Sequence, residues 1–268
     1  MNRATMPTGW AQNPDGSPGY TWNPITGCLN HIGRMCKGGN FPCYAYGIAH
    51  RRCKNVYLAN NNIAGMDVLP ASETVSIMAE DPFYPRFWPE KLYHAWDDKP
   101  KGIFVCSMSD LFGIGVPEEW TKTVLNLCRL HTENRYYLLT KQPQNLAKFS
   151  PFPDNCWVGV TATTNGAMTN AYYGLANVEA SVRFISFEPL LGSVGIIEHP
   201  NMKGWVDWVI IGAQSKPTRL PNTEWVREII EAADSAGIPV FLKDNLNSEN
   251  LPSNAFNKEG LVRREVPA

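Results

Sequence analysis

The sequence predicts an α/β fold in the form of a complete or partial (β/α) barrel of the TIM type. From residue 100 onward, short apolar runs alternate with longer segments of mixed polarity, as parallel strands alternate with crossover helices. The runs are apolar throughout, which is typical of strands that are buried on both faces. Six to eight such strands in about 250 residues fit a barrel better than a sandwich. A doubly wound open sheet is the second interpretation.

The first elements are predicted as follows. A strand at Tyr20–Asn23 leads directly into a segment that is rich in cysteine and glycine. The next strand, Gly102–Ser107, precedes a helix that runs from Pro117 or Glu118 to about Leu130. Proline at the start of that helix and two glutamates in its first turn suit the positive end of the helix dipole.

Another helix is predicted from Glu224 to Ala236, because Gly237 can adopt the left-handed conformation that ends many helices. Residues 55–100 contain five prolines and are expected to form an irregular excursion over the barrel. We therefore expect residues 1–268 to form one domain. The remaining strands are predicted at Arg135–Thr140, Trp157–Thr161, Arg183–Phe187, Trp208–Ile211 and Pro239–Lys243.

Charge and hydropathy exclude several classes of protein. The chain has 24 Lys and Arg against 25 Asp and Glu, so no overall field attracts it to nucleic acid or an anionic membrane. No stretch approaches the roughly 18 apolar residues that cross a bilayer, and the first residues lack the apolar core of a signal peptide. We expect a cytoplasmic protein with no membrane contact.

The seven cysteines fall into two groups. A reducing cytoplasm argues against a disulfide framework, which leaves metal binding and buried thiols as their uses. The scattered group lies in apolar surroundings and is expected to be buried as small hydrophobic residues. The clustered group is Cys28, Cys36, Cys43 and Cys53, and the scattered group is Cys106, Cys128 and Cys156.

Cys28, Cys36 and Cys43 are separated by seven and six residues, with glycines and a proline between them. This pattern indicates a flexible loop, residues 28–43, that can bring three thiolates together. A helix is expected to begin near Cys43. A 4Fe-4S cluster can use three cysteines and leave one iron open. A structural zinc needs a fourth ligand, for which His31, His50 and Cys53 are available.

Polar residues directly follow each predicted strand, at the edge where parallel α/β folds bind ligands. Because the cysteine loop follows the first strand, it belongs to the same edge, and this position favours a cluster that faces a reaction chamber. Loops are polar in most proteins, so any one of these residues, taken singly, can simply belong to a solvent-exposed loop. Lys141 and Glu188 stand out because each is a charge placed just beyond an apolar strand. A structural salt bridge between the two is the simpler interpretation.

Several short sequence motifs, which we call words, resemble those of a bacterial and phage three-Cys-motif family of unknown function and occur in the same order. That family is similar to divergent radical S-adenosylmethionine (SAM) enzymes, and the resemblance covers residues 20–245. Two of the words, around Lys141 and Glu188, also resemble segments of the spore-photoproduct-lyase branch, which repairs a DNA lesion. The words are Trp22–Cys28, Cys43–Ala45, Ser107–Phe112, Leu139–Pro143, Ser186–Gly192 and Phe241–Lys243.

The resemblance implies a radical-SAM-like barrel in which Cys28, Cys36 and Cys43 hold a 4Fe-4S cluster. The open iron would bind the amino and carboxylate groups of SAM. An electron from a donor such as flavodoxin or ferredoxin would cleave SAM to a 5′-deoxyadenosyl radical, which the barrel shields from water. Lys141 and Glu188 are then predicted to be catalytic. By their placement, the residues predicted to bind the cofactor are Ser107, Ser109, Asp110, Thr161, Thr163, Gln214 and Lys243.

Two features depart from the family pattern. Relatives usually keep the last two cysteines two residues apart, whereas six residues, 37–42, intervene here and could reshape the cluster entrance. Gln214 stands where relatives commonly have an acid, which puts a proton-transfer role at this position in doubt.

The substrate is predicted to be a nucleobase or nucleic acid, from the phage association and from basic residues near the loop. These residues, which can equally form a solvated helix face, are Arg34, Lys37, Arg51, Arg52 and Lys54.

Two other functions stay open. One is a zinc-stabilised nucleic-acid-binding or adaptor protein without catalysis. The other is a metal-independent TIM-barrel hydrolase with Glu188 and Asp110 as acid and base.

Overall fold

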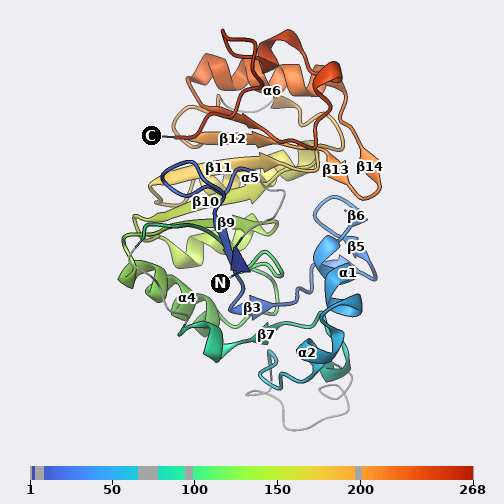
Figure 1. The fold of residues 1–268 in the computed structure, drawn as a ribbon, viewed down its shortest axis with the longest axis vertical. Coiled ribbons are helices and arrows are strands. Elements are labelled where there is room, and N and C mark those ends of the chain that lie inside the picture. The colour runs from blue at the N-terminus through green and yellow to red at the C-terminus, as the bar shows by residue number, and fades with distance from the viewer. Residues whose placement is uncertain (1, 4–8, 66–77, 94–98, 197–200, 268) are drawn as a thin grey trace.

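The computed structural model of the chain describes residues 2–3, 9–65, 78–93, 99–196 and 201–267. Within these residues the main sheet has eight strands, in the order β1, β2, β8, β9, β10, β11, β12 and β15 (Figure 1). Strand β1 (Asn2–Arg3) pairs antiparallel with β2, and all the other pairs are parallel. The parallel strands are β2 (Tyr20–Trp22), β8 (Gly102–Val105), β9 (Arg135–Thr140), β10 (Cys156–Thr161), β11 (Val182–Phe187), β12 (Trp208–Ile211) and β15 (Val240–Leu242).

The seven parallel strands of the described chain form a curled half-barrel, which confirms an α/β fold with a partial barrel. The alternative of a complete barrel is wrong, because β15 does not pair with β2. Instead, the free edge of β15 bonds to the C-terminal segment, where the Glu265 N–H donates to the Val240 carbonyl at 3.0 Å. Backbone groups at the sheet edge are thereby satisfied.

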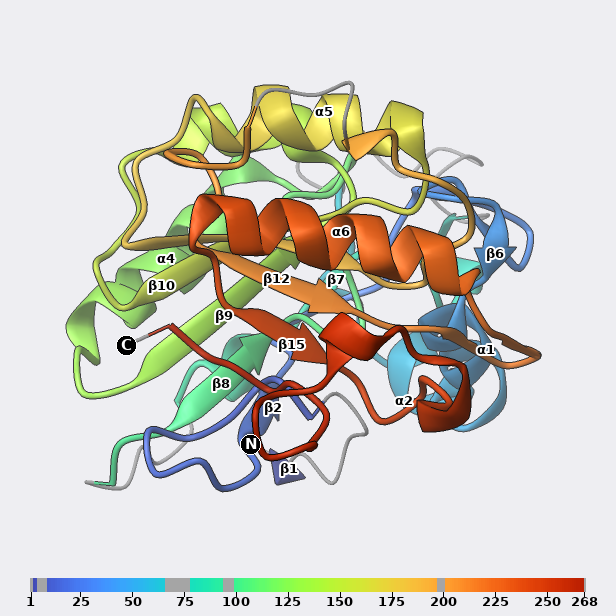
Figure 2. The ribbon, with the colours of Figure 1, turned by 90° about the horizontal axis from the view of Figure 1, so that it is seen from above.

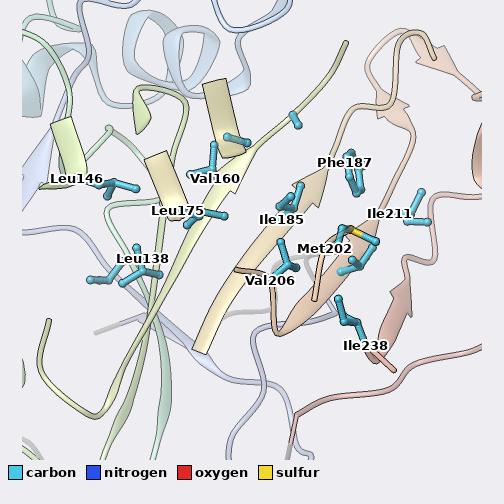
Figure 3. Close-up of a cluster of buried hydrophobic side chains, with 14 of the residues drawn as sticks. Leu138, Leu146, Val160, Leu175, Ile185, Phe187, Met202, Val206, Ile211 and Ile238 are labelled. Carbon is cyan, nitrogen blue, oxygen red and sulfur yellow. The ribbon is translucent and has the colours of Figure 1, made fainter. Parts of the chain in front are cut away.

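Three helices pack on the convex face of the sheet: α4 (Glu118–Leu130), α5 (Asn165–Leu175) and α6 (Thr223–Ala236). Their apolar faces share one buried cluster with the outward side chains of the strands. Figure 3 shows part of this cluster, with Val160, Ile185 and Ile211 projecting from neighbouring strands and Leu175 from α5. In Figure 2 helices α5 and α6 lie on the side of the sheet away from the N-terminus.

The concave face is filled by aromatic side chains around Trp10. The Trp10 ring lies 5.1 Å from Phe104 of β8, 5.5 Å from Tyr137 of β9 and 5.7 Å from Phe184 of β11, measured between ring centroids. Trp10 itself is 1% exposed. The N-terminal segment therefore closes the interior of the half-barrel below the carboxyl ends of the strands.

The predicted strands agree with the observed ones to within about two residues at each end, a normal margin for strand and helix boundaries. Helix α6 ends as predicted at Gly237, which has a φ of 70°. The three scattered cysteines Cys106, Cys128 and Cys156 are buried, as expected. Helix α5 was not predicted, because its 11 residues include no charged residue and open without an acidic first turn.

In the expected excursion at 55–100, residues 66–77 and 94–98 lie outside the described part. None of the described helices has the length and apolar character that a membrane crossing requires. The remaining helical elements are α1 (Tyr44–Arg51), α2 (Lys54–Leu58), η1 (Pro89–Lys91), η2 (Pro143–Phe149), η4 (Ser248–Asn250) and η5 (Ser253–Ala255). The remaining strands are β3 (Ile25–Thr26), β4 (His31–Ile32), β5 (Met35–Cys36), β6 (Phe41–Pro42), β7 (Arg86–Phe87), β13 (Gln214–Ser215) and β14 (Thr218–Arg219).

Candidate functional site

The cysteine loop, residues 28–43, lies at the edge of the half-barrel toward which the parallel strands point. In Figures 1 and 2 the blue segment that carries β4, β5, β6 and α1 sits at this edge. The loop follows β2 and β3, as the sequence predicts, and forms a small three-stranded antiparallel sheet of its own. The loop is thus an ordered element with a fixed position beside the strand ends.

Each of the three loop cysteines is held by a different piece of backbone. The Cys28 N–H donates to the carbonyl of Phe83 at 2.9 Å. Cys36 lies in β5 and is 8% exposed. Cys43 is the N-cap residue of α1, where its Sγ accepts a hydrogen bond from the Tyr46 N–H at 3.5 Å. The helix predicted near Cys43 therefore begins there with the cysteine as its cap.

Two glycines let the loop lie directly on the ends of β9 and β10. A Cβ at Gly39, whose φ is +144°, would lie 2.5 Å from Oγ1 of Thr163, and a Cβ at Gly38 would lie 2.9 Å from the Lys141 side chain. Thr163 Oγ1 donates to the Gly38 carbonyl at 3.1 Å. No side chain larger than hydrogen fits at Gly39, so the loop docks on Thr163 through its backbone.

The three thiols lie close enough to influence one another electrostatically. Burial, together with the smaller effects of the Asp110, Cys36 and Cys43 charges, raises the pKa of Cys28 to about 12. Burial also raises the pKa of Cys36, and the positive charge of Lys141 acts in the opposite direction by lowering it. Among the described residues no three His, Cys, Asp or Glu side chains stand in position to hold one metal ion. The raised pKa values keep Cys28 and Cys36 protonated while no cation is bound, and three cysteine sulfurs are donors of the type that hold a 4Fe-4S cluster or a zinc ion.

The residues available as a fourth zinc ligand are engaged elsewhere. Nε2 of His50 lies 3.5 Å from Asp81 Oδ1. Nδ1 of His31 lies 2.8 Å from the Gly33 carbonyl. Cys53 is the N-cap residue of α2 and lies beside the hydroxyl of Tyr57. None of the three candidates is therefore placed as a fourth zinc ligand in the described part of the chain.

Ser107, Ser109 and Asp110 bond to neighbouring loops. The Ser107 hydroxyl donates to Asn23 Oδ1 at 3.2 Å, and the Ser109 hydroxyl donates to the Ile25 carbonyl at 3.1 Å. Asp110 is 7% exposed and accepts hydrogen bonds from the Thr140 hydroxyl at 2.8 Å and the Lys141 N–H at 3.0 Å. These bonds join the ends of β2, β8 and β9, and contact of these residues with SAM stays a prediction.

Lys141, Thr161 and Thr163 meet the cysteine loop at a cavity of about 780 Å³. The cavity is bordered by loop residues 37–40, the residues after β9 and β10, and the first turn of α5. Thr161 is 5% exposed, and its Oγ1 has no hydrogen-bond partner. Unpartnered buried hydroxyls are rare in native structures, so this one distinguishes the wall of the cavity at the end of β10.

Glu188 pairs with Lys243 and not with Lys141. The Lys243 ammonium bonds to Glu188 Oε1, and Nδ2 of Asn245 lies 3.3 Å from the same oxygen. The two side chains are 23% and 6% exposed respectively. The interpretation that Lys141 and Glu188 form a structural salt bridge is therefore wrong. Gln214 lies in the β13–β14 hairpin, where its Nε2 donates to the Pro217 carbonyl at 2.8 Å.

Three further polar residues lie at this edge. The sequence predicts that they follow strands, but it does not predict their individual roles. Ser186 is 1% exposed and its hydroxyl has no partner. Gln142 is 5% exposed and has an unpartnered Nε2. Asn245 bonds to Glu188 and to the Ala213 carbonyl.

A family model described as "Protein of unknown function (DUF5131)" matches residues 16–259. The chain belongs to this family. The DUF5131 match spans the cysteine loop and every parallel strand of the half-barrel, so the site described above lies within the family region. The expected membership of a family of unknown function is confirmed, and the resemblance of DUF5131 to radical SAM enzymes stays a prediction. Neither a curated protein nor a solved structure matches the chain.

Proposed function

We propose that the protein is an iron-sulfur enzyme of the radical SAM type. The observation that carries this proposal is the placement of three mutually influencing thiols, Cys28, Cys36 and Cys43, on a loop docked against the carboxyl ends of a parallel half-barrel. These residues would hold a 4Fe-4S cluster. The cavity beside them, with the unpartnered hydroxyl of Thr161, offers space for SAM and a substrate.

The chain's own residues have distinct parts in this proposal. Thr163 bonds to the loop at the Gly38 carbonyl, and the Lys141 side chain lies against Gly38. Thr161 and Ser186, which are neighbours across β10 and β11, present buried hydroxyls that can bond to a bound cofactor. Trp10 and its aromatic neighbours close the opposite end of the interior, which keeps water away from reactive species.

When bound, the cluster would supply the one electron that breaks a carbon–sulfur bond of SAM and gives methionine and a 5′-deoxyadenosyl radical. The electron would come from a donor protein, for which we propose a flavodoxin or a ferredoxin. Glu188, held by Lys243, and Lys141 would recognise SAM or the substrate.

The test is reductive cleavage of SAM by the reconstituted protein. We expect dithionite-reduced protein to form 5′-deoxyadenosine from SAM, and Cys36→Ala to abolish the product. Cys128→Ala is the matched control, because Cys128 is buried in the helix α4 core far along the chain from the loop, and it should leave the product unchanged. Absence of both SAM binding and 5′-deoxyadenosine would reject the proposal.

The same purified protein also tests the two other functions. A colourless protein that carries one zinc would indicate the zinc-stabilised nucleic-acid-binding or adaptor protein. A hydrolase that uses Glu188 and Asp110 would survive loss of all three loop cysteines. The bonds of Asp110 to Thr140 and Lys141, and of Glu188 to Lys243, weigh against free acid and base roles for the two carboxyls.

A further inference from the structure

The cavity beside the cysteine loop is lined by two lysines, Lys37 and Lys141, and among the described residues that line it there is no Asp or Glu. Neither lysine forms an ion pair with a described residue. The carboxylate of Asp110 accepts hydrogen bonds from the Thr140 hydroxyl and from the Lys141 backbone N–H, and does not pair with either ammonium group. In a chain whose formal net charge is −1, this cavity is locally positive.

The first turn of α5 opens into the same cavity. Thr164, the N-cap residue, makes no side-chain capping bond, and the first turn has no acidic residue. Gly166 lines the cavity, and a Cβ placed there would meet nothing within 4 Å. The partial positive charge at this end of an 11-residue helix therefore faces open space, which suits an anion.

Two buried side chains point independently to a ligand. Thr161 and Gln142 both line the cavity, both are 5% exposed, and each has a polar atom without a hydrogen-bond partner, Oγ1 and Nε2 respectively. Oε1 of Gln142 accepts a hydrogen bond from the Ile114 N–H at 2.9 Å. This bond identifies the unpartnered atom of the Gln142 amide as the NH₂ donor. An unpaired buried donor is costly, and an acceptor oxygen of a bound water or ligand at this wall of the cavity would offset that cost.

We infer that this cavity binds the phosphate group of a small phosphorylated substrate of about nucleotide size. Two ammonium groups, a helix N-terminus, an amide and a hydroxyl offer more donors than a carboxylate can use, and they suit the several oxygens of a phosphate. The volume of about 780 Å³ lies within the range of small-molecule sites. Two lysines are too few for the basic track of a nucleic-acid polymer. This inference rests on the proposed function only for what is done to the ligand.

The test compares AMP with adenosine as probes in calorimetric titrations of the full chain. We expect AMP to bind at least about tenfold more tightly, because the difference isolates the phosphate. Lys141→Gln and Lys37→Gln should each weaken AMP binding about tenfold or more and leave adenosine binding unchanged. The matched control is Lys258→Gln, which removes an exposed lysine that does not line the cavity and should change neither affinity. Inorganic phosphate should compete with AMP.

Three results would overturn the inference. AMP and adenosine could bind equally, Lys258→Gln could weaken AMP as much as the cavity variants, or a single-stranded oligonucleotide could bind more tightly than AMP through the same lysines. Lys37 is exposed, so its variant keeps the test valid if Lys141→Gln fails to fold. Iron content is measured in the same sample. If the reconstituted parent protein holds no iron but still binds AMP more tightly than adenosine, the result counts against the proposed function and not against this inference.

Discussion

Thr161 has a buried hydroxyl without a partner, whereas the hydroxyl of Thr140 donates to Asp110 at 2.8 Å. Valine has the shape of threonine, so the two substitutions should separate the two environments. We expect Thr161→Val to leave the free energy of unfolding unchanged or to raise it by about 1 kcal/mol, and to weaken ligand binding in the cavity. Thr140→Val should cost about 1.5–3 kcal/mol, because it removes a hydrogen bond to a charged group. Denaturant unfolding measures both, and an equal loss in the two variants would contradict this account.

The Glu188–Lys243 pair changes what is expected of Glu188. Lys243 is 6% exposed, so Glu188→Gln leaves a buried ammonium without a counter-charge. We expect a loss of about 3 kcal/mol in the free energy of unfolding, at the lower end for a buried pair because Glu188 is 23% exposed. Lys141→Met should cost less than about 1 kcal/mol, since no described carboxylate pairs with it. A melting temperature of Glu188→Gln equal to that of the parent would show that the pair contributes little.

At the scale of elements, the cysteine loop depends on the close approach of Gly39 to Thr163. In Gly39→Ala the added Cβ would lie 2.5 Å from Thr163 Oγ1, and the backbone would keep a φ that disfavours side chains. We expect a cost of about 1–3 kcal/mol and poor retention of iron after reconstitution. Gly33→Asn is the control in the same loop, because asparagine tolerates positive φ and the position has open space. Equal iron retention in the two variants would mean that docking on Thr163 does not support the site.

The strands and the two charged helices were predictable because apolar runs and capping residues are local signals. Helix α5 was not, since its sequence of small and aromatic residues forms a helix through packing of Met168 and Leu175 on the sheet. At the site, the loop cysteines and Lys141 were predictable from residue type and position after a strand. The pairing of Glu188 with Lys243 reaches across β12, where a Cβ at Gly212 would lie 2.9 Å from the Lys243 side chain and 3.1 Å from the Glu188 side chain, and no local pattern predicts this contact.

At the scale of the whole molecule, Trp10 connects the N-terminal segment to the interior of the half-barrel. Its ring contacts side chains of β8, β9, β11 and β12. We expect Trp10→Ala to lower the free energy of unfolding by about 3–5 kcal/mol, because it leaves a cavity in the centre of the fold. Tyr93→Ala, at a position that is 85% exposed, should change it by less than about 0.5 kcal/mol. Similar free energies of unfolding for the two variants in chemical denaturation would show that the stability of the interior does not depend on Trp10.

The sequence pattern predicted the half-barrel but not how it is closed. Trp10 belongs to no repeating apolar pattern, and its burial follows from contacts with residues more than 90 positions away in the chain. The cover of β15 by residues 263–265 is likewise a long-range pairing.

The central claim is that Cys28, Cys36 and Cys43 hold a 4Fe-4S cluster at the mouth of the half-barrel. The most direct measurement is the iron and acid-labile sulfide content per chain after anaerobic reconstitution. The account predicts about four of each in the parent protein and in Cys106→Ala, and loss of both when any one of the three loop cysteines is replaced by alanine. One zinc and no iron per chain, or full iron content in the loop-cysteine variants, would contradict it.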